Sequence, residues 1–385
     1  MPLTCSYPPA EAHLPTICHV TTAHRASDVR IYERECRSLS SLPDTKVVLI
    51  GWGGLPDGSR VAHVSLPPPP SGRGRRFLTA PRRGWRAAVG VKADVYHFHD
   101  PELIPVAIGL SRRGYRVIWD AHEDYQEQFR TGGGKEWLPG PARAAAAAAI
   151  GALLRKMDRS AAGVVAATPT IAERYDNPRT VVVGNEARLE DFSECAPDFH
   201  AGRVLFTGFS EPRHCFEAVV RAVADFPDLR LAVAGGPPDP DQWGLASALL
   251  GERLEHLGWL DRVGLAAACN DSSVGAVTYA DTKPYAVAQP TKLFEFAACG
   301  LPMLMTPNAS ITSKPGAVRS GVVASDFTSD ALTVALRDLL SSQQRWEEMS
   351  RSGREFAAEQ GSWNESEARL FDLYEQILRG PGVAR

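Results

Sequence analysis

The stretch QPTKLFEFAACGLPMLM, residues 289–305, has residue types and a spacing that suit binding of a charged ligand. Pro290 favours a helix start and Gly300 favours its end. A helix N-terminus presents unpaired N–H groups and a partial positive charge, which attract phosphate oxygens. Lys292 would add a full charge there, and Glu295, one turn on, could accept hydrogen bonds from a pair of hydroxyls. The pattern predicts a site for a diphosphate joined to ribose; the alternative is an ordinary amphipathic helix with a solvated Lys292–Glu295 ion pair.

A second set of polar residues follows two predicted strands in the first half of the chain. Residues 97–105 read HFHDPELIP and residues 119–125 read WDAHEDY. Because the carboxyl ends of parallel strands meet at one edge of a sheet, we expect both clusters to line a cleft. His97 and His99 would lie on the same side of their strand. These residue types are metal ligands, but no HxHxDH or HExxH spacing is present, and Asp-Pro-Asp at 239–241 lies in a proline-rich loop. The sequence predicts no metal site.

The elements that must position these residues alternate along the chain. Strands are predicted at 17–21, 46–50, 61–64, 94–98, 116–120, 163–167, 180–183, 203–207, 229–234, 254–257, 274–278, 303–305 and 321–323. Helices are predicted at 29–41, 77–89, 102–112, 141–160 and 169–175, then from Arg213, near 243–250, at 261–270, 329–341 and 344–359, and about 364–378. Strands alternating with helices indicate right-handed βαβ units and mostly parallel sheets. Two such series, joined near residue 185, predict two α/β domains.

Composition limits the class of protein. The chain has 385 residues, 44% apolar and 23% charged, which suits two domains with large cores. A net charge of −3 gives no reason to expect a nucleic-acid partner. Seven cysteines without CxxC pairing favour reduced thiols in a cytoplasmic protein. No run approaches 18 apolar residues, and residues 1–14 read as a loose leader rather than a signal peptide.

An arginine-rich segment follows the tetraproline at 67–70. Six arginines lie between residues 73 and 86, together with Phe77 and Trp85. Such a segment could contact an anionic membrane or an acidic acceptor. We favour a solvated helix face behind a stiff proline linker.

Two motifs resemble those of a known family. PTKLFEFAACGLP resembles the nucleotide-sugar helix of retaining GT-B glycosyltransferases, the large family with sucrose-synthase-like and mannosyltransferase members. HDPELIP resembles the His-(Glu/Asp)-Pro element of its mannosyl- and N-acetylglucosaminyltransferases, whose histidine lies against the donor sugar. The resemblance implies two Rossmann-like domains facing across a cleft. Residues 1–185 would form the acceptor side and 186–362 the nucleotide-sugar side, with a C-terminal helix within 363–385 crossing back to the first domain.

The same resemblance assigns residues to roles. Catalysis falls to His99, Arg213 and Lys292. Donor binding falls to Gly208, Arg213, Gly235, Gly236, Pro290, Thr291, Lys292, Leu293 and Glu295. Acceptor binding falls to His24, Asp28, Arg30, His97, His122 and Glu123. Arg213 would donate hydrogen bonds to two phosphate oxygens at once. The glycines would let the backbone approach the nucleotide, although glycine also suits an ordinary strand-to-helix turn. Asp28 has an alternative role as a helix N-cap.

Two departures from the family pattern bear on the donor. Phe209 stands where relatives commonly have an arginine, and Val287 stands where many have the first of two glutamates. The second departure leaves the sugar's identity open.

The function implied is that of a retaining, metal-independent glycosyltransferase that uses a nucleotide-diphosphate sugar and no cofactor. UDP-N-acetylglucosamine and UDP-glucose are the most frequent donors in the family, and the acceptor hydroxyl could belong to a natural product, a glycan or a lipid. Two alternatives remain: a UDP-sugar epimerase or phosphorylase on the same fold, and a non-catalytic sugar-binding descendant.

Overall fold

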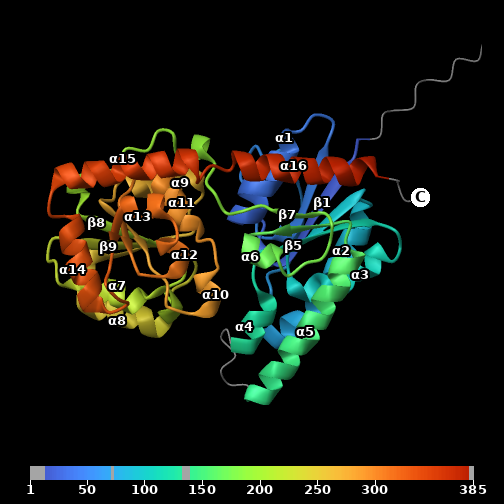
Figure 1. Ribbon diagram of the computed structural model, residues 1–385, viewed down its shortest axis with the longest axis horizontal. Helices are drawn as coiled ribbons and strands as arrows, with labels where there is room; N and C mark the ends of the chain where they lie inside the picture. The colour runs from blue at the N-terminus through green and yellow to red at the C-terminus, as the bar shows by residue number, and fades with distance from the viewer. Residues whose placement is uncertain (1–13, 71–72, 132–138, 381–385) are drawn as a thin grey trace, which may run out of the picture.

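The computed structural model describes residues 14–70, 73–131 and 139–380, and its strands form two parallel sheets (Figure 1). The first half contains β1 (Thr16–Arg25), β2 (Lys46–Trp52), β3 (Ala62–Leu66), β4 (Val95–Phe98), β5 (Arg116–Ala121), β6 (Gly163–Ala166) and β7 (Thr180–Val182). The second half contains β8 (Arg203–Thr207), β9 (Arg230–Ala234), β10 (Leu254–Gly258), β11 (Val274–Val277), β12 (Met303–Met305) and β13 (Gly321–Val323). Every predicted strand is therefore present, within a few residues of its predicted bounds.

The strand order explains where a ligand can bind. The first sheet runs β3-β2-β1-β4-β5-β6-β7 and the second runs β10-β9-β8-β11-β12-β13. In each sheet the order reverses beside the first strand, so that β1 borders β4 and β8 borders β11. The connections leave opposite faces at such a switch point and open a crevice at the strands' carboxyl ends. Central strands such as β4 and β11 are buried along their whole length because helices cover both faces.

Helices cover both sheets. The first half has η1 (Val29–Cys36), α1 (Arg37–Ser41), α2 (Arg73–Val91), η2 (Pro101–Leu103), α3 (Ile104–Ser111), α4 (Tyr125–Thr131), α5 (Gly140–Ser160) and α6 (Pro169–Ala172). The second half has η3 (Leu189–Phe192), η4 (Phe199–Ala201), η5 (Pro212–His214), α7 (Phe216–Ala224), α8 (Pro240–Leu250), η6 (Gly251–Arg253), α9 (Arg262–Asn270), α10 (Lys283–Ala286), α11 (Thr291–Cys299), α12 (Ala309–Thr312), α13 (Pro315–Arg319), α14 (Ser329–Leu339) and α15 (Gln343–Glu359). Among the described residues, no helix has the length and apolarity needed to cross a bilayer.

Several helices differ from their predicted form. The helix predicted at 29–41 is a π-helical segment, η1, followed by the short α1. The helix expected to begin at Arg213 is a 3₁₀ turn, η5, and α7 begins only at Phe216. The Asp-Pro-Asp sequence is a helix start, because the Asp239 carboxylate accepts from the backbone N–H groups of Asp241 and Gln242, each at 3.1 Å.

The last helices join the two halves (Figure 1). α15 packs on α11 and α13 of the second half, and α16 (Asn364–Arg379) packs on β6, β7 and η1 of the first. Trp363 lies buried between them and its indole N–H donates to the Ser38 hydroxyl at 2.8 Å. Leu370 and Tyr374 belong to the core of the first half. The crossing predicted for residues 363–385 is therefore present. Residues 381–385 and most of the expected leader lie outside the described residues.

The arginines of α2 fit the solvated helix face. Arg75, Arg82 and Arg86 are exposed. Arg76 instead pairs with buried Glu102, with Nε 2.6 Å from Oε1. Contact of this helix with a membrane stays an alternative prediction.

Candidate active site

Helix α11 is a core element rather than a surface helix. It starts after Pro290, and Gly300 ends it in the left-handed region, at φ +69°. Glycine adopts this conformation without the strain that a side chain would bring. Every residue from Lys292 to Cys299 is buried. This burial removes the solvated Lys292–Glu295 ion pair as an explanation of the motif.

Lys292 is a buried cation at the first turn of α11. Its Nζ donates to the carbonyl of Thr207 at 3.1 Å, at the end of β8. The same Nζ lies 4.6 Å from the ring centroid of Phe206 and 4.8 Å from that of Tyr279. Burial lowers the pKa of Lys292 to about 7. Among the described residues no carboxylate pairs with this ammonium, so it remains available to an anionic ligand.

Arg213 lies in the neighbourhood of Lys292. The pKa of the intervening His214 is lowered to about 3, first by burial and then by the charges of Lys292 and Arg213. Arg213 is half-exposed on η5, where it pairs with Glu211. The helix predicted to begin at Arg213 begins only at Phe216, so Lys292 lies in the first turn of a helix, whereas Arg213 stands on the turn before one.

Glu295 faces a different partner from the one predicted. Its carboxylate pairs with Arg262 of α9 and lies 3.8 Å from Nη2 of Arg34, which belongs to η1 of the first half. Glu295 is 4% exposed, so the predicted contact with ribose hydroxyls does not fit this conformation without a rearrangement. The residue instead joins the two halves of the molecule. Leu293, another predicted donor contact, is wholly buried in the core of the second half.

The predicted glycines lie at the carboxyl ends of β8 and β9. Gly208 has φ +116° and Gly235 has φ +157°, which favour glycine. A Cβ on Gly235 would approach the Gly208 carbonyl oxygen to 2.1 Å, so close packing of the two turns alone requires the residue. Gly236 lies beneath two aromatic side chains, with Phe209 and Trp259 each 3.0 Å from where a Cβ would be.

These two aromatic side chains form an exposed platform. Phe209 is 44% and Trp259 53% exposed, and their rings meet edge to face at 6.0 Å. Arg25, at the end of β1, places its guanidinium carbon 5.5 Å from the Trp259 ring and 5.0 Å from the Trp52 ring. The platform therefore faces the first half. No local pattern marks Arg25 as a site residue, because its aromatic partners are distant in the chain.

The end of β1 is held by a buried carboxylate. Asp100 Oδ2 accepts from the Thr21 hydroxyl at 2.9 Å and from the backbone N–H groups of Thr22 and Ala23 at 2.5 and 3.1 Å. The ring of His24 in this loop lies 3.4 Å from Asp100 and 3.3 Å from Asp28.

Asp28 acts as the N-cap of η1. Its carboxylate accepts from the backbone N–H groups of Arg30 at 2.9 Å and Ile31 at 3.0 Å. Burial opposes a charge on His24, but the hydrogen bond and charge of Asp28, with the charges of Asp100 and Glu123, raise the pKa of His24 to about 10. His24 is therefore a cation at neutral pH, and Asp28 both caps the helix and stabilises that charge.

Replacing His24 by glutamine is expected to lower stability in a pH-dependent way. The folded pKa is raised above the unfolded value of about 6.5, so the contribution is complete below pH 6.5 and is lost as pH rises towards 10. The loss should be about 1 kcal/mol at pH 6, the size typical of a partly exposed ion pair. Denaturant unfolding at pH 6 and pH 10 measures it, and an equal loss at both pH values would contradict the ion pair.

Asp120 is the centre of a buried network at the end of β5. Its carboxylate lies 2.9 Å from Nδ1 of His99, 3.1 Å from Nδ1 of His122 and 2.7 Å from Nη2 of Arg30. Burial alone would raise the pKa of Asp120, but Arg30, His122 and His99 hold it well below its usual range. The carboxylate is therefore ionised and fixes the orientation of all three side chains.

Two predicted histidines are not accessible. His99 is fully buried, and its other nitrogen, Nε2, lies 3.0 Å from Nδ1 of His19. His97 is also fully buried, with Nδ1 2.9 Å from the Tyr374 hydroxyl. Neither ring can contact a sugar or an acceptor in this conformation, so the roles predicted for His99 and His97 do not fit it. His122 does reach the surface, since its side chain is 13% exposed.

Arg30 likewise has a different role from the predicted contact with an acceptor. Its Nη1 donates to the carbonyls of Val183 and Gly184 at 2.9 and 3.2 Å, and to Asn185 Oδ1 at 3.1 Å. Arg30 therefore holds the connection between the two halves. Asn185 in turn donates to the Gln289 carbonyl at 2.9 Å, immediately before α11. A continuous set of hydrogen bonds thus runs from Asp120 to the start of α11.

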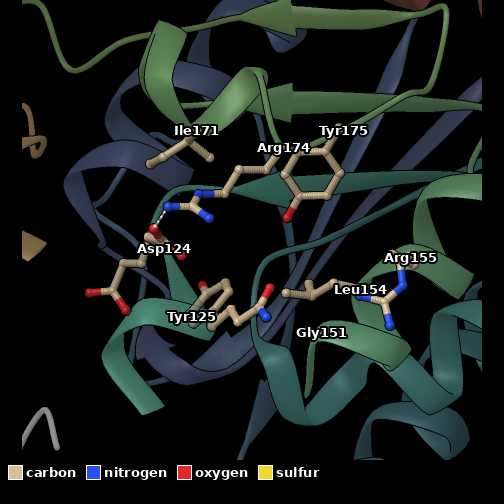
Figure 2. Close-up of a pocket in the computed structure, with 10 residues that line it drawn as sticks. Asp124, Tyr125, Gly151, Leu154, Arg155, Ile171, Arg174 and Tyr175 are labelled. Carbon is tan, nitrogen blue, oxygen red and sulfur yellow. Dashed lines mark ion pairs between the residues drawn. The ribbon is translucent and has the colours of Figure 1, made fainter. Parts of the chain in front are cut away.

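Glu123, the remaining predicted acceptor residue, lines a cavity of about 230 Å³ between α4, α5 and α6 (Figure 2). Figure 2 shows the rings of Tyr125 and Tyr175 and the guanidinium of Arg174 at this cavity. Arg174 pairs with Asp124 at 2.5 Å. The Tyr125 hydroxyl lies 3.1 Å from Nε2 of His122, so this side chain connects the cavity with the polar network around Asp120.

Comparisons with known proteins agree with this arrangement. Residues 43–186 match the model of the glycosyl transferase 4-like domain, and residues 213–372 match that of the glycosyl transferase-like domain. The two matches fall on the first and second halves in turn and span most of the chain. The chain belongs to the GT-B glycosyltransferases. A comparison with curated proteins gave no match.

Solved structures of glycosyltransferases share the whole fold. Sucrose-phosphate synthase of Thermosynechococcus elongatus superposes with a TM-score of 0.71 at 17% identity, covering 95% of this chain and 100% of that one. WaaG, a glycosyltransferase involved in lipopolysaccharide biosynthesis, has a TM-score of 0.70 at 15% identity, with 95% and 100% covered. Anabaena HepE in complex with UDP-glucose has a TM-score of 0.66 at 12% identity, with 94% and 100% covered.

Proposed function

We propose that this glycosyltransferase moves a sugar, with retention of configuration, from a UDP-sugar to a hydroxyl acceptor. The observation that carries the proposal is Lys292, a buried ammonium at the start of α11 beside the switch point of the second sheet. An unpaired buried cation is costly unless a ligand supplies the counter-charge. Structures of HepE with UDP-glucose and of a trehalose-6-phosphate protein with UDP-2-fluoro glucose support a UDP-sugar as that ligand.

Each part of the site has a role in this proposal. The diphosphate contacts Lys292 and the α11 N-terminus, and Arg213 leaves Glu211 to bind a phosphate oxygen. The base lies on the Phe209–Trp259 platform. The positive charges of Lys292 and Arg213 are in place before the reaction, so they stabilise the diphosphate leaving group as the sugar takes on oxocarbenium character. In this proposal the donor site uses no metal ion.

The first half provides the acceptor side of the reaction. The cationic His24, with His122 and Glu123, faces the acceptor, while His99 holds Asp120 in place rather than contacting the sugar. The departing diphosphate accepts the proton of the acceptor hydroxyl, so no separate base is required. UDP-glucose and UDP-N-acetylglucosamine are the donors to test first.

A thermal-shift screen of UDP-, GDP- and dTDP-sugars tests the donor. A ligand at 100 times its Kd stabilises the folded protein by about 2.7 kcal/mol. We expect the melting temperature to rise with UDP-sugars and to change little with the others. Stabilisation by GDP-sugars alone would overturn the choice of base.

Retention is checked by NMR, because the first sugar released by hydrolysis of UDP-glucose should be the α-anomer, whereas an inverting enzyme would release the β-anomer.

Donor binding should also take up a proton. Lys292 has a pKa of about 7, so it is mostly neutral at pH 8 in the free protein, and the charge of UDP should raise its pKa and protonate it. We expect an uptake approaching one proton per UDP at pH 8, measured by calorimetry in buffers of different ionisation enthalpy. A Lys292→Met variant that took up as much would show that another group titrates.

A further inference from the structure

A fully buried cluster of titratable side chains lies inside the first half, and none of its members contacts the donor or the acceptor in the proposed sugar transfer. Its members are His19, Glu35, His97 and His99. One nitrogen from each imidazole and one carboxylate oxygen all lie within 4.8 Å of one another. The four residues come from β1, η1 and the end of β4, so three separate elements converge on one point.

Glu35 shows that hydrogen bonds alone do not account for the cluster. Within the part of the chain that the structure describes, neither oxygen of its carboxylate has a hydrogen-bond partner, and neither does Nε2 of His97. Arg30 comes nearest, with Nε 3.4 Å from Oε1 of Glu35. Buried carboxylates without hydrogen bonds are rare because desolvation of the group is then uncompensated. A bound ion or an ordered water would supply the missing partner.

The distances fit ligands arranged around a single ion. Neighbouring ligand atoms of a tetrahedral zinc ion lie about 3.3 Å apart when the bonds are about 2.0–2.1 Å. Here Nδ1 of His19 lies 3.0 Å from Nε2 of His99 and 3.8 Å from Oε2 of Glu35. Nδ1 of His97 lies 3.6 Å from the same oxygen. Contacts of 3.6 and 3.8 Å are too long for direct hydrogen bonds but suit two atoms that share an ion.

Groups outside the cluster orient the imidazoles. The Asp120 carboxylate lies 2.9 Å from Nδ1 of His99, which leaves Nε2 directed into the cluster. The Tyr374 hydroxyl lies 3.3 Å from Nε2 of His19, which leaves Nδ1 of that ring directed into the cluster. The same hydroxyl lies 2.9 Å from Nδ1 of His97, a contact that a bound ion would replace. Such carboxylate–histidine pairs and outer hydrogen bonds are the usual supports of metal-binding imidazoles.

We propose that His19, Glu35, His97 and His99 bind one divalent transition-metal ion, most simply zinc. Three imidazoles and a carboxylate complete a tetrahedral set with no position left for a substrate, which is the form of a structural site. The ion joins β1, β4 and η1 beneath α16 and is separate from the diphosphate chemistry proposed for the second half. Because all four ligands are fully buried, the ion binds as the protein folds.

The metal content of the purified full chain tests this proposal. The protein, with any affinity tag removed, is dialysed against a chelator to strip surface ions, then unfolded and analysed by mass spectrometry for first-row metals. We expect about one ion per chain. Glu35→Gln and His97→Gln should each reduce this content at least tenfold, whereas His200→Ala, at an exposed histidine of the other half, should leave it unchanged.

A second measurement avoids variants that fail to fold. Wild-type chain is unfolded, stripped of metal and refolded with zinc or with chelator. The zinc-refolded protein should melt at a higher temperature, and protein refolded with cobalt should show the visible absorption of a tetrahedral site. Less than a tenth of an ion per chain together with equal melting temperatures would overturn the proposal and indicate a bound water. Retention of the ion by both variants would overturn the assignment of its ligands.

Discussion

Replacing Lys292 by methionine is expected to lower kcat/KM for sugar transfer about 100-fold, which corresponds to about 2.7 kcal/mol of transition-state stabilisation. The ammonium is directed to the end of β8, where it contacts the Thr207 carbonyl and two ring faces. Methionine preserves the length and the apolar contacts of the side chain but removes the charge. The effect should appear in kcat as well as in donor affinity, because the negative charge on the diphosphate grows as the glycosidic bond breaks.

The same substitution should stabilise the protein without ligand. The pKa of Lys292 falls from 10.5 in the unfolded chain to about 7 in the folded one. Between these pH values the unfolded chain binds more protons, so the stability of the wild type rises with pH, and the cost of burying the charge is greatest below pH 7. Lys292→Met should therefore melt at a higher temperature than the wild type at pH 6.5, and this difference should shrink towards pH 10.

Lys314 supplies a matched control for this pair of effects. Its Nζ also donates to a carbonyl of the second half, that of Ser310, at 2.7 Å, and burial also lowers its pKa. Lys314→Met should leave sugar transfer within about twofold of the wild type. If Lys292→Met transferred sugar as fast as Lys314→Met, the diphosphate would not bind at the start of α11.

Local chemistry explains why so much of the fold could be predicted. Strands could be predicted because strands buried on both faces are continuous apolar runs between turn residues, and β11 and β12 are such runs. The start and stop of α11 were recognised because Pro290 and Gly300 act on their own neighbours. The pattern of residues 29–41 predicts one helix and does not distinguish the π-helical form of Val29–Cys36 from an α-helix.

The candidate site was predicted only where one element determines it. Lys292 lies at a helix start whatever surrounds it, so its position could be inferred. His97 and His99 were placed correctly at the end of β4, but their burial depends on Tyr374, 277 residues from His97 in the chain, and on Asp120. Partners that meet through tertiary packing leave no local pattern, which is why Arg25 and the partners of Glu295 were also missed.

Replacing Glu295 by alanine is expected to destabilise the protein by about 3 kcal/mol, because removal of one partner leaves buried charges uncompensated. Arg262 and Arg34 both face this carboxylate, and burial already lowers the pKa of Arg34 to about 10. Denaturant unfolding measures the loss. Glu217→Ala, which removes an exposed pair with Arg221 on α7, should cost less than about 0.5 kcal/mol.

Stability alone cannot separate a structural Glu295 from one that also binds ribose, but nucleotide affinity can. Glu295→Gln keeps the shape of the side chain. Arg262→Met with Glu295→Leu removes two of the three buried charges and leaves Arg34, which should recover part of the stability. If the carboxylate leaves Arg262 to accept the ribose hydroxyls, both variants should bind UDP at least tenfold more weakly than the wild type. They should bind 2′,3′-dideoxy-UDP as the wild type does. An equal loss of affinity for the two nucleotides would show that Glu295 acts only at the junction between the halves. On α11, Lys292 alone would then hold the diphosphate.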